Sequence, residues 1–600
     1  MRCDTLLLSA ALASVATAGR SLQHVGRKAD DSLAAMYNNV ARNYASFSGH
    51  HDEPLHKRSQ HQFLSNKTSS FAVNGTGIPD VDFDVGESYA GNLPITSDPK
   101  DPNQLFFWFF PSTNPDASKE IVIWLNGGPG CSSLEGLSQE NGPFIWQYGT
   151  FLPVKNTWSW NKLSNIVYIE QPVGTGFAVG EPTATSEEDV AQQFLGFWKN
   201  FVDTFSLYDY KVYITGESYA GMYCPYIASA MIDENDPKYF NVSGMLMYDP
   251  VIGPNDIQGP IPTVAFVDYW TGLFPFNDSF VEDIHARDAK CGYTDYMNKY
   301  LSFPPAGPQP FILPGQDSDG VTSDECANIF NDVIYAAILV NPCFDIYQVA
   351  TTCPLLWDVL GFPGTISYLP EGAEIYFDRA DVKKAINAPS NVTWASCSDI
   401  SVFVNDTDSS LVPSIHALPH VIDTTKNVII AHGALDMVLL ANGTILTIQN
   451  MTWGGKMGFQ SPPVEPLYVP FHDDPVEGSI AGSGVMGTFH TERGLTYAGV
   501  ALSGHMVPQY APGVAYRQLE FLLGRIDSLD SVVPFTTDKN FTEQASEADL
   551  GEGNAPQGYA SNWTAPASDT TTVKTSPAAK GIELSLASLA GVLLAVFYLA

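Results

Sequence analysis

Short apolar runs alternate with amphipathic stretches through the middle of the chain. The runs lie at 105–110, 120–125, 165–170, 211–215, 245–248 and 427–431, and they indicate buried strands. Helical periodicity falls between several of them, most clearly at 186–205 and 220–232. Strands that alternate with helices form a mostly parallel sheet. The pattern therefore predicts an α/β domain over residues 71–525.

One long stretch breaks this rhythm. Residues 255–425 hold most of the Pro and Gly punctuation, together with five cysteines, Cys291, Cys326, Cys343, Cys353 and Cys397. We expect this stretch to be an insertion that lies over the sheet as a cap.

The charge balance excludes several classes of function. The chain has 29 basic and 65 acidic residues among 600, which gives a net charge of −36. Such a chain repels phosphate backbones and anionic lipids, so a nucleic-acid partner is excluded. The excess of carboxyl groups suits a protein that works in acid, where many of them are neutral.

The first eighteen residues predict a secretory signal peptide. Arg2 supplies the positive start, an apolar run follows at 6–13, and Ala16-Thr17-Ala18 satisfies the small-residue cleavage rule. Residues 19–70 are polar and include the dibasic pair Lys57-Arg58, which is typical of a propeptide. The histidine-rich cluster at 50–56 is interpreted as a solvated polar run, so neither a metal nor a cofactor is expected.

The other end of the chain predicts a lipid anchor. Residues 526–580 are acidic and low in complexity, like a stalk, and residues 581–600 are apolar with no basic residue after them. Small residues, a polar spacer and an apolar terminus are the pattern of a GPI signal. Ser568 is the candidate attachment residue. A tail anchor is the alternative.

Secretion also agrees with the sequons and the cysteines. Ten N-x-[ST] sequons favour a glycosylated protein that is secreted or held at the cell surface, with membrane contact only through the lipid anchor. Cys3 leaves with the signal peptide, so seven cysteines remain and at least one has no partner within the chain. The sequons are Asn66, Asn74, Asn241, Asn277, Asn391, Asn405, Asn442, Asn450, Asn540 and Asn562.

A candidate nucleophile motif occurs twice. The sequence Gly-Glu-Ser-Tyr-Ala-Gly stands at 86–91 and again at 216–221. A nucleophile elbow needs a buried strand before the serine and a helix after it. Only the second copy has both, whereas Pro94 argues against a helix after the first. We therefore predict that Ser218 is the nucleophile and that Ser88 is structural, in an early β-hairpin.

The partners of Ser218 should follow it in the order Asp, then His, as in an α/β-hydrolase. Asp436 comes just after the strand at 427–431, and His505 stands in a Gly- and Pro-framed loop before a helix at 514–523. His432 is the rival base, but it lies where the strand approaches Asp436 and is interpreted as a core or strand-end packing residue. The Gly-rich loop at 124–133 follows the first strong strand, where this fold has its oxyanion loop. Together these motifs predict an α/β-hydrolase fold.

The motifs also resemble those of one family, the serine carboxypeptidases, over about residues 80–525. The residues that carry the resemblance lie at 124–133, 140–143, 158–161, 171–177, 216–221, 433–436 and 504–508. The resemblance implies that Gly128 and Tyr219 supply the oxyanion-hole donors. It also implies a role for further residues in substrate binding. Those that would hold the substrate carboxylate are Asn126, Glu217, Glu140 and Trp124, and Met506 would line the leaving-group pocket.

The resemblance further implies a disulfide between Cys131 and Cys397. Cys224 is then the free thiol, and the other four cysteines of the insertion pair among themselves. Three pairings are possible. We expect the nested one, in which Cys291 pairs with Cys353 and Cys326 with Cys343.

The implied function is release of C-terminal residues from peptides in acid, through an acyl-enzyme. Two contacting glutamates share a proton, so one pKa rises and the protonated acid donates to the substrate carboxylate. Alternatives are an acyltransferase on the same scaffold, an esterase or lipase, and a non-catalytic cell-wall glycoprotein. The sequence does not define the preferred side chains or the oligomeric state.

Overall fold

The computed structural model describes residues 61–117, 119–354, 356–361, 373–472 and 482–537. The chain divides into two units, residues 1–62 and 63–600, and every element below belongs to the second. The predicted signal peptide, most of the leader, Ser568 and the apolar tail lie outside the described residues. Within the described part, no helix combines the length and apolarity needed to cross a bilayer.

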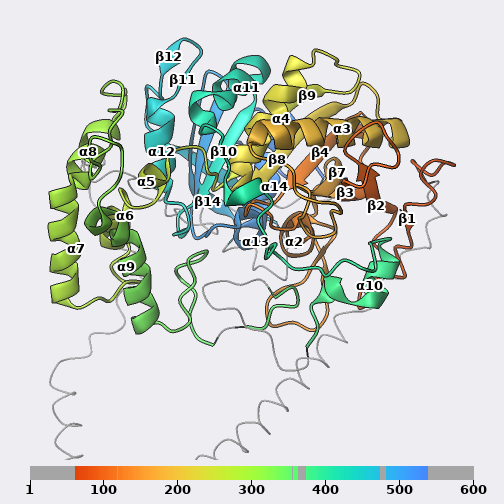
Figure 1. The fold of residues 1–600 in the computed structure, drawn as a ribbon, viewed down its shortest axis with the longest axis horizontal. Coiled ribbons are helices and arrows are strands. Elements are labelled where there is room, and N and C mark those ends of the chain that lie inside the picture. Colours follow the sequence, from red (N-terminus) through yellow and green to blue (C-terminus); the bar gives the residue numbers. More distant parts are fainter. Residues whose placement is uncertain (1–60, 118, 355, 362–372, 473–481, 538–600) are drawn as a thin grey trace, which may run out of the picture. The chain divides into compact units, whose positions relative to one another are not determined.

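A single large sheet forms the centre of the fold (Figure 1). Its spatial order is β1 (Ala72–Val73), β2 (Ser88–Pro94), β3 (Gln104–Phe110), β7 (Asn165–Glu170), β4 (Glu120–Leu125), β8 (Lys211–Glu217), β9 (Asn241–Tyr248), β10 (Val428–Gly433), β15 (Leu495–Val500), β14 (Gly484–Glu492) and β13 (Glu465–Val469). The six strands from β7 to β15 run parallel, and the strands at both edges are antiparallel. The mostly parallel sheet predicted from the apolar runs is therefore confirmed.

Helices cover both faces of the sheet, because both faces of a parallel sheet are apolar. One face packs against α3 (Glu187–Phe205), α4 (Ala220–Asp233), α11 (Ala417–Thr425) and α12 (Ala441–Asn450). The other face packs against α2 (Ser133–Gly136), α10 (Ala380–Ala385) and α14 (Pro512–Leu522). The sheet thus separates two apolar cores, one on each side.

The insertion lies between β9 and β10, as expected, and it has two parts (Figure 1). The first part holds α5 (Asn255–Gln258), α6 (Thr263–Tyr269), α7 (Asp278–Cys291), α8 (Tyr293–Tyr300) and α9 (Asp324–Val340). The second part includes α10, and there Arg379 forms a salt bridge with Asp80 near the start of the domain. The second part of the insertion therefore contacts the segment that leads into β2.

The disulfides of the insertion correct one prediction. Cys291 pairs with Cys326, and Cys343 pairs with Cys353, so the nested arrangement is wrong. The first bond joins the end of α7 to the first turn of α9, with Cα atoms 5.9 Å apart. The second bond closes a loop, with Cα atoms 5.2 Å apart. Spacing along the chain does not reveal which helix ends meet, so the sequence could not decide between these pairings.

Packed residues extend beyond both predicted borders of the domain. The compact unit begins at Phe63 rather than 71, and the Phe63 ring lies 5.2 Å from that of Phe109. At the other end, Leu529 is fully buried and Phe535 packs against Trp158, with ring centroids 4.9 Å apart. Residues 526–537 thus belong to the folded body, because their isolated apolar side chains fill gaps in the core.

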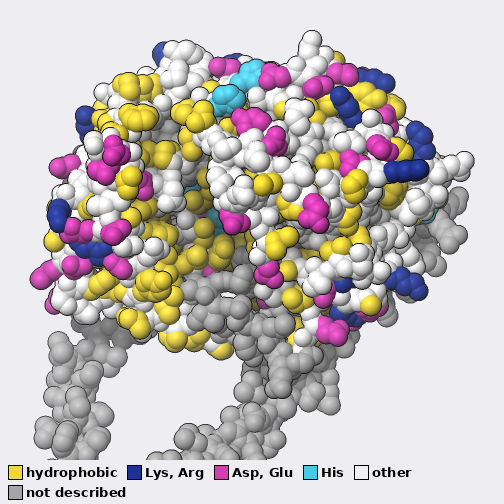
Figure 2. All heavy atoms as spheres, in the orientation of Figure 1, with side chains coloured by type: hydrophobic (Ala, Val, Ile, Leu, Met, Phe, Trp, Pro, Cys, Tyr) yellow, Lys and Arg dark blue, Asp and Glu magenta, His cyan; other side chains and the backbone are white. Residues whose placement is uncertain are grey.

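Acidic side chains are more widely spread than basic ones on one face of the molecule (Figure 2). On the face drawn in Figure 2, Asp and Glu are spread over the whole area, whereas Lys and Arg gather mainly toward its left and right margins. The sequons differ in exposure: Asn66, Asn74, Asn277, Asn391 and Asn405 are exposed, while Asn241, Asn442 and Asn450 are half-buried. Asn540 and Asn562 lie outside the described residues.

Candidate active site

Ser218 occupies a sharp turn between β8 and α4. Its backbone has a left-handed conformation, with φ at +61°, which is strained for a non-glycine residue. The Ser218 N–H donates to the carbonyl oxygen of Tyr248 at 2.9 Å. A methyl group on Gly221 would lie 2.5 Å from the backbone nitrogen of Val251, so the turn closes only with glycine there. This is the geometry of a nucleophile elbow.

Ser88 lies elsewhere. It is buried in β2, where its Cα pairs with that of Val73. Strands β3, β7 and β4 separate β2 from β8, a distance of roughly 19 Å at the usual spacing of strands. The second copy of the motif is therefore the one at the candidate site.

Asp436 and His505 meet at the same edge of the sheet as Ser218. They follow β10 and β15, and both strands run parallel to β8. His505 Nδ1 lies 2.8 Å from Asp436 Oδ2, and both side chains are buried. His505 Nε2 has no hydrogen-bond partner among the described residues. That nitrogen is the atom available to the Ser218 hydroxyl.

The insertion holds the His505 loop in place. The His505 N–H donates to the carbonyl oxygen of Tyr347 at 2.7 Å, and the two rings pack edge to face at 5.3 Å. A methyl group on Gly504 would lie 1.9 Å from that same oxygen. Gly504 is thus required by the close approach of the insertion to the catalytic loop.

His432 is occupied by a structural contact. Its Nε2 donates to the Leu439 carbonyl oxygen at 2.7 Å, and burial lowers its pKa to about 4. It therefore stays neutral at most pH values. This arrangement agrees with the packing role that its position in the strand predicted.

Asp249 is a site residue that the sequence analysis missed. Its Oδ1 accepts from the Gly433 N–H at 2.8 Å, and burial, followed by the charge of Asp436, raises its pKa well above the usual range. One ligand-type atom each from Asp249, Asp436 and His505 lies within 4.8 Å of the others. A metal accepts such a set, but here His505 and Asp436 already bind each other, and we assign no metal. The available signal was that Asp249 directly follows a buried strand at its carboxyl end.

The glycine-rich loop lies against the elbow. A methyl group on Gly127 would lie 2.4 Å from the backbone nitrogen of Tyr219 and 2.9 Å from Ser218 Cβ. Gly128 follows with a φ of +111°, which favours glycine. The loop therefore brings the backbone of Gly128 beside Ser218 and Tyr219.

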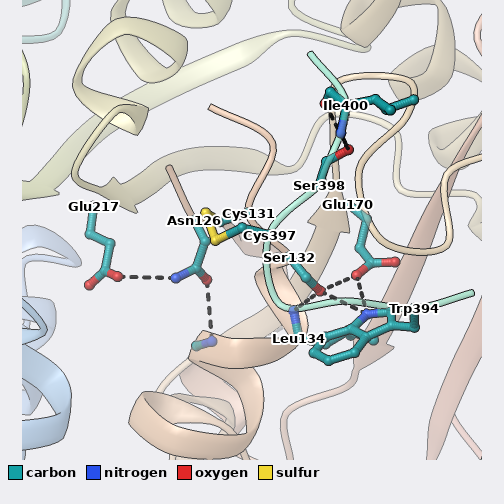
Figure 3. The surroundings of a disulfide bond; sticks show 11 residues. Asn126, Cys131, Ser132, Leu134, Glu170, Glu217, Trp394, Cys397, Ser398 and Ile400 are labelled. Carbon is teal, nitrogen blue, oxygen red and sulfur yellow. Dashed lines mark hydrogen bonds between the residues drawn. A yellow bond between two sulfur atoms is a disulfide. The ribbon is translucent and has the colours of Figure 1, made fainter. Parts of the chain in front are cut away.

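A disulfide ties this loop to a distant segment (Figure 3). Cys131 and Cys397 are bonded across 266 residues, as the family resemblance implied. Beside the bond, the Ser132 N–H donates to the Ser396 carbonyl oxygen at 2.7 Å, and the Ser398 N–H donates to the Gly130 carbonyl oxygen at 2.9 Å. The loop is thus held on both sides of the disulfide.

Asn126 presents its amide in one orientation. Its Oδ1 accepts from Trp124 Nε1 at 2.7 Å and from the Gly136 N–H at 3.2 Å. Its Nδ2 can then donate only in the opposite direction, and it reaches Glu217 Oε1 at 3.1 Å (Figure 3). The elbow, the glycine-rich loop and β4 are joined through this one side chain.

Glu140 and Glu217 form a buried acid pair. Burial raises the pKa of Glu140 to about 7. Burial, and after it the charge of Glu140, raises the pKa of Glu217 well above its usual range. Glu217 and the Asn126 amide approach Glu140 closely enough to lower its pKa partly, yet both Glu140 oxygens and Glu217 Oε2 lack a hydrogen bond of good geometry among the described residues. Glu140 lies in a single π-helical turn, Leu137–Asn141, a feature that often occurs at functional sites.

Two further residues singled out in the sequence, Met506 and Cys224, lie at the helices that follow His505 and Ser218. Met506 directly follows His505 and is buried at the start of α13 (Val507–Tyr510). Cys224 is a buried free thiol on α4, and burial raises its pKa, so it is not a reactive thiolate.

Comparisons with known proteins agree with this geometry. The sequence model of the serine carboxypeptidase family matches residues 79–524. A protein of Arthroderma benhamiae named "Probable serine carboxypeptidase" is 52% identical over 520 residues, which cover 85% of this chain and 95% of that protein. Serine-type carboxypeptidase F of Aspergillus niger is 46% identical over 547 residues, which cover 88% of this chain and 99% of that protein.

A solved structure shares the fold. It is Kex1Δp, a prohormone-processing carboxypeptidase from Saccharomyces cerevisiae, with a TM-score of 0.60 and 22% identity, covering 77% of this chain and 98% of that one. The chain belongs to the serine carboxypeptidase family, a family of hydrolases that act as exopeptidases through an acyl-enzyme.

Proposed function

We propose that this carboxypeptidase releases C-terminal residues from peptides in acid, with Ser218, His505 and Asp436 as its catalytic triad. The observation that supports this assignment is the 2.8 Å contact between His505 and Asp436, which leaves His505 Nε2 buried and unpaired at the sheet edge where Ser218 lies. A base oriented by a carboxylate is what a serine needs in order to act as a nucleophile.

The reaction follows from these positions. Ser218 Oγ attacks the scissile carbonyl carbon while His505 Nε2 takes the hydroxyl proton. The backbone N–H groups of Gly128 and Tyr219 stabilise the oxyanion. His505 then gives the proton to the leaving amine, which departs with the C-terminal residue. Water repeats the sequence on the acyl-enzyme and regenerates Ser218.

The acid pair would restrict the enzyme to the C-terminus of a peptide, because it binds the free carboxylate there. The unpaired oxygens of Glu140 and Glu217 need a partner, and a substrate carboxylate beside Asn126 can be that partner when an acid carries its proton. Asn126 Nδ2 adds a second donor, and Trp124 orients it. Met506 would contact the leaving residue. A protonated acid distinguishes this site from an arginine clamp, because its affinity for a carboxylate disappears as the proton leaves.

The same proposal includes processing and location. A signal peptide over 1–18 would direct the chain to the secretory pathway. The precursor would be a zymogen, which removal of the leader would activate. The tail at 581–600, with attachment near Ser568, would anchor the enzyme by GPI to the cell surface. The exposed sequons at Asn66, Asn74, Asn277, Asn391 and Asn405 are the acceptors we expect to carry glycans.

The test compares the two serines of the repeated motif. Ser218→Ala should abolish labelling by a fluorophosphonate probe and lower kcat/KM for a blocked dipeptide by about 10⁴-fold or more. Ser88→Ala should keep both labelling and activity, because Ser88 lies in β2. Equal loss in the two variants would contradict the assignment, and transfer of the acyl group to an added alcohol instead of water would favour the acyltransferase alternative.

A further inference from the structure

Glu187 is a buried carboxyl group that the proposed reaction does not use. It is the first residue of α3, fully buried, and both of its carboxyl oxygens lack a hydrogen-bond partner among the described residues. Its backbone N–H donates to Ser410 Oγ at 2.6 Å. An unpaired buried carboxylate is costly, and groups of this kind cluster at functional sites.

Asp408 lies beside it and faces Tyr219, the residue that follows the nucleophile. The Tyr219 hydroxyl donates to Asp408 Oδ2 at 2.6 Å. The same hydroxyl lies close enough to Glu187 to lower the pKa of that carboxyl group somewhat, but a phenol has one proton to donate and gives it to Asp408. Asp408 Oδ1 accepts from the N–H and the hydroxyl of Ser410, at 2.9 and 2.6 Å. The half-buried Asp408 and Tyr219 thus stand between solvent and the fully buried Glu187.

No positive charge compensates these two acids. No salt bridge to either carboxyl group exists within the part of the chain that the structure describes. Burial, followed by the charge of Asp408, raises the pKa of Glu187 well above its usual range. The charge of Glu187 also contributes to the raised pKa values of Tyr219 and Tyr223. Two acids next to the elbow therefore lack a cation.

These acids and the carboxylate-binding set lie on opposite sides of Ser218. Trp124 and Tyr248 belong to one of the two apolar cores, and the helices and loops around Glu140 pack there. Tyr219 and Tyr223 pack in the other core, together with Phe403. If the leaving residue binds near Asn126, as proposed above, then the residue that forms the acyl-enzyme extends toward Tyr219 and Asp408.

The ligand that would neutralise Asp408 and Glu187 is a cation at the end of a long, flexible side chain. A penultimate Lys carries its ammonium on four carbons, and a penultimate Arg carries a planar fork of donors that matches a carboxylate. Either can extend alongside Tyr219 to Asp408. A cation bound at Asp408 favours ionisation of Glu187 behind it, because an opposite charge nearby stabilises the charged form of a carboxyl group.

We propose that Asp408 and Glu187 form a subsite that binds the cationic side chain of a penultimate Lys or Arg in the substrate. The proposal rests on the proposed function, and it adds a substrate class to it. Asp408 makes the first contact, and Glu187 supplies a second negative charge behind it.

The experiment uses matched substrates. Blocked dipeptides with one common C-terminal residue carry Arg, its neutral isostere citrulline, Lys or norleucine at the penultimate position. At pH 5 the wild-type enzyme should prefer Arg to citrulline in kcat/KM by about tenfold to a hundredfold, the value of a charged hydrogen bond. In Asp408→Asn and in Glu187→Gln this Arg-to-citrulline ratio should fall at least fivefold.

The ratio is measured within each variant, so a fraction of misfolded enzyme cancels. Glu181→Gln removes an exposed acid that forms no hydrogen bond with Asp408, Ser410 or Glu187 within the described part of the chain, and it is the control that should keep the wild-type ratio. The proposal is overturned if wild type hydrolyses the Arg and citrulline substrates equally, or if both variants keep the wild-type ratio. Failure of the proposed function looks different, since none of the four dipeptides would then be hydrolysed.

Discussion

At the scale of residues, the site depends on which buried carboxyl groups carry a proton. Asp436 faces His505, and its neighbour Asp249 is fully buried with one oxygen, Oδ2, unpaired among the described residues. Two adjacent carboxyl groups without a cation cannot both ionise cheaply. A neutral Asp249 adds no second negative charge beside the Asp436–His505 pair of the proposed triad.

Asp249→Asn should preserve this arrangement without a titratable group. The raised pKa of Asp249 means that the folded state binds its proton more tightly than the unfolded state. The stability that this proton contributes is present in acid and is lost as pH rises through the folded pKa. The melting temperature of Asp249→Asn should therefore fall less between pH 5 and pH 9 than that of wild type, as followed by circular dichroism.

Asp249→Ala is the matched control, because it removes the oxygen that accepts from Gly433. It should lower the melting temperature at both pH values. If Asp249→Asn loses as much stability in alkali as wild type does, Asp249 is not the group that holds the proton.

At the scale of elements, the apolar runs predicted strands well because each parallel strand is buried on both faces. Strand β8 extends two residues beyond the predicted end, to Glu217, and β9 begins four residues earlier than predicted, at Asn241. The nucleophile elbow was predictable because the residues that form it are neighbours in the sequence: a strand, Ser218 with its small flanking residues, and a helix. The contact of Tyr347 with the His505 loop was not, because it joins the insertion to a loop about 150 residues away and leaves no periodic signal in the sequence.

The disulfide between Cys131 and Cys397 should support both folding and catalysis. Closing so long a loop constrains the unfolded chain, and loss of such a bond typically costs about 2–5 kcal/mol. Because the bond holds the glycine-rich loop beside Tyr219, the double variant Cys131→Ala/Cys397→Ala should also lower kcat. Thermal unfolding and initial rates measure the two effects.

The bond between Cys291 and Cys326 provides the comparison, since it joins α7 to α9. The double variant Cys291→Ala/Cys326→Ala should lose stability but keep kcat. Equal kcat in both double variants would mean that the Cys131–Cys397 bond stabilises the fold without positioning the loop.

At the scale of the whole molecule, carboxyl groups are in excess on the surface and are also buried in the interior. The chain carries a net charge of −36, and the described interior holds several carboxyl groups whose pKa burial raises, among them Glu135, Glu140, Glu187 and Glu217. In acid the surface repulsion falls and the interior groups keep their protons. A molecule of this kind is suited to an acidic environment, which agrees with the charge balance of the sequence.

The central claim is that a protonated acid pair recognises the substrate carboxylate, and the pH dependence of KM tests it most directly. KM is measured from pH 4 to pH 8 for a blocked dipeptide and for its C-terminal amide, with wild type, Glu140→Gln and Glu217→Gln. The surface variant Glu181→Gln, at an exposed glutamate, controls for net charge. Because the donating proton is present below the raised pKa of Glu140, about 7, and is lost above it, wild-type KM for the free acid should rise about tenfold to a hundredfold across that range.

The amide should show no such rise, and both Gln variants should flatten the profile of the free acid, because Gln keeps a donor and has no proton to lose. The Glu181→Gln profile should match wild type. If both Gln variants keep the wild-type KM profile, or if the acid and the amide respond alike in wild type, Glu140 and Glu217 are not the groups that bind the substrate carboxylate.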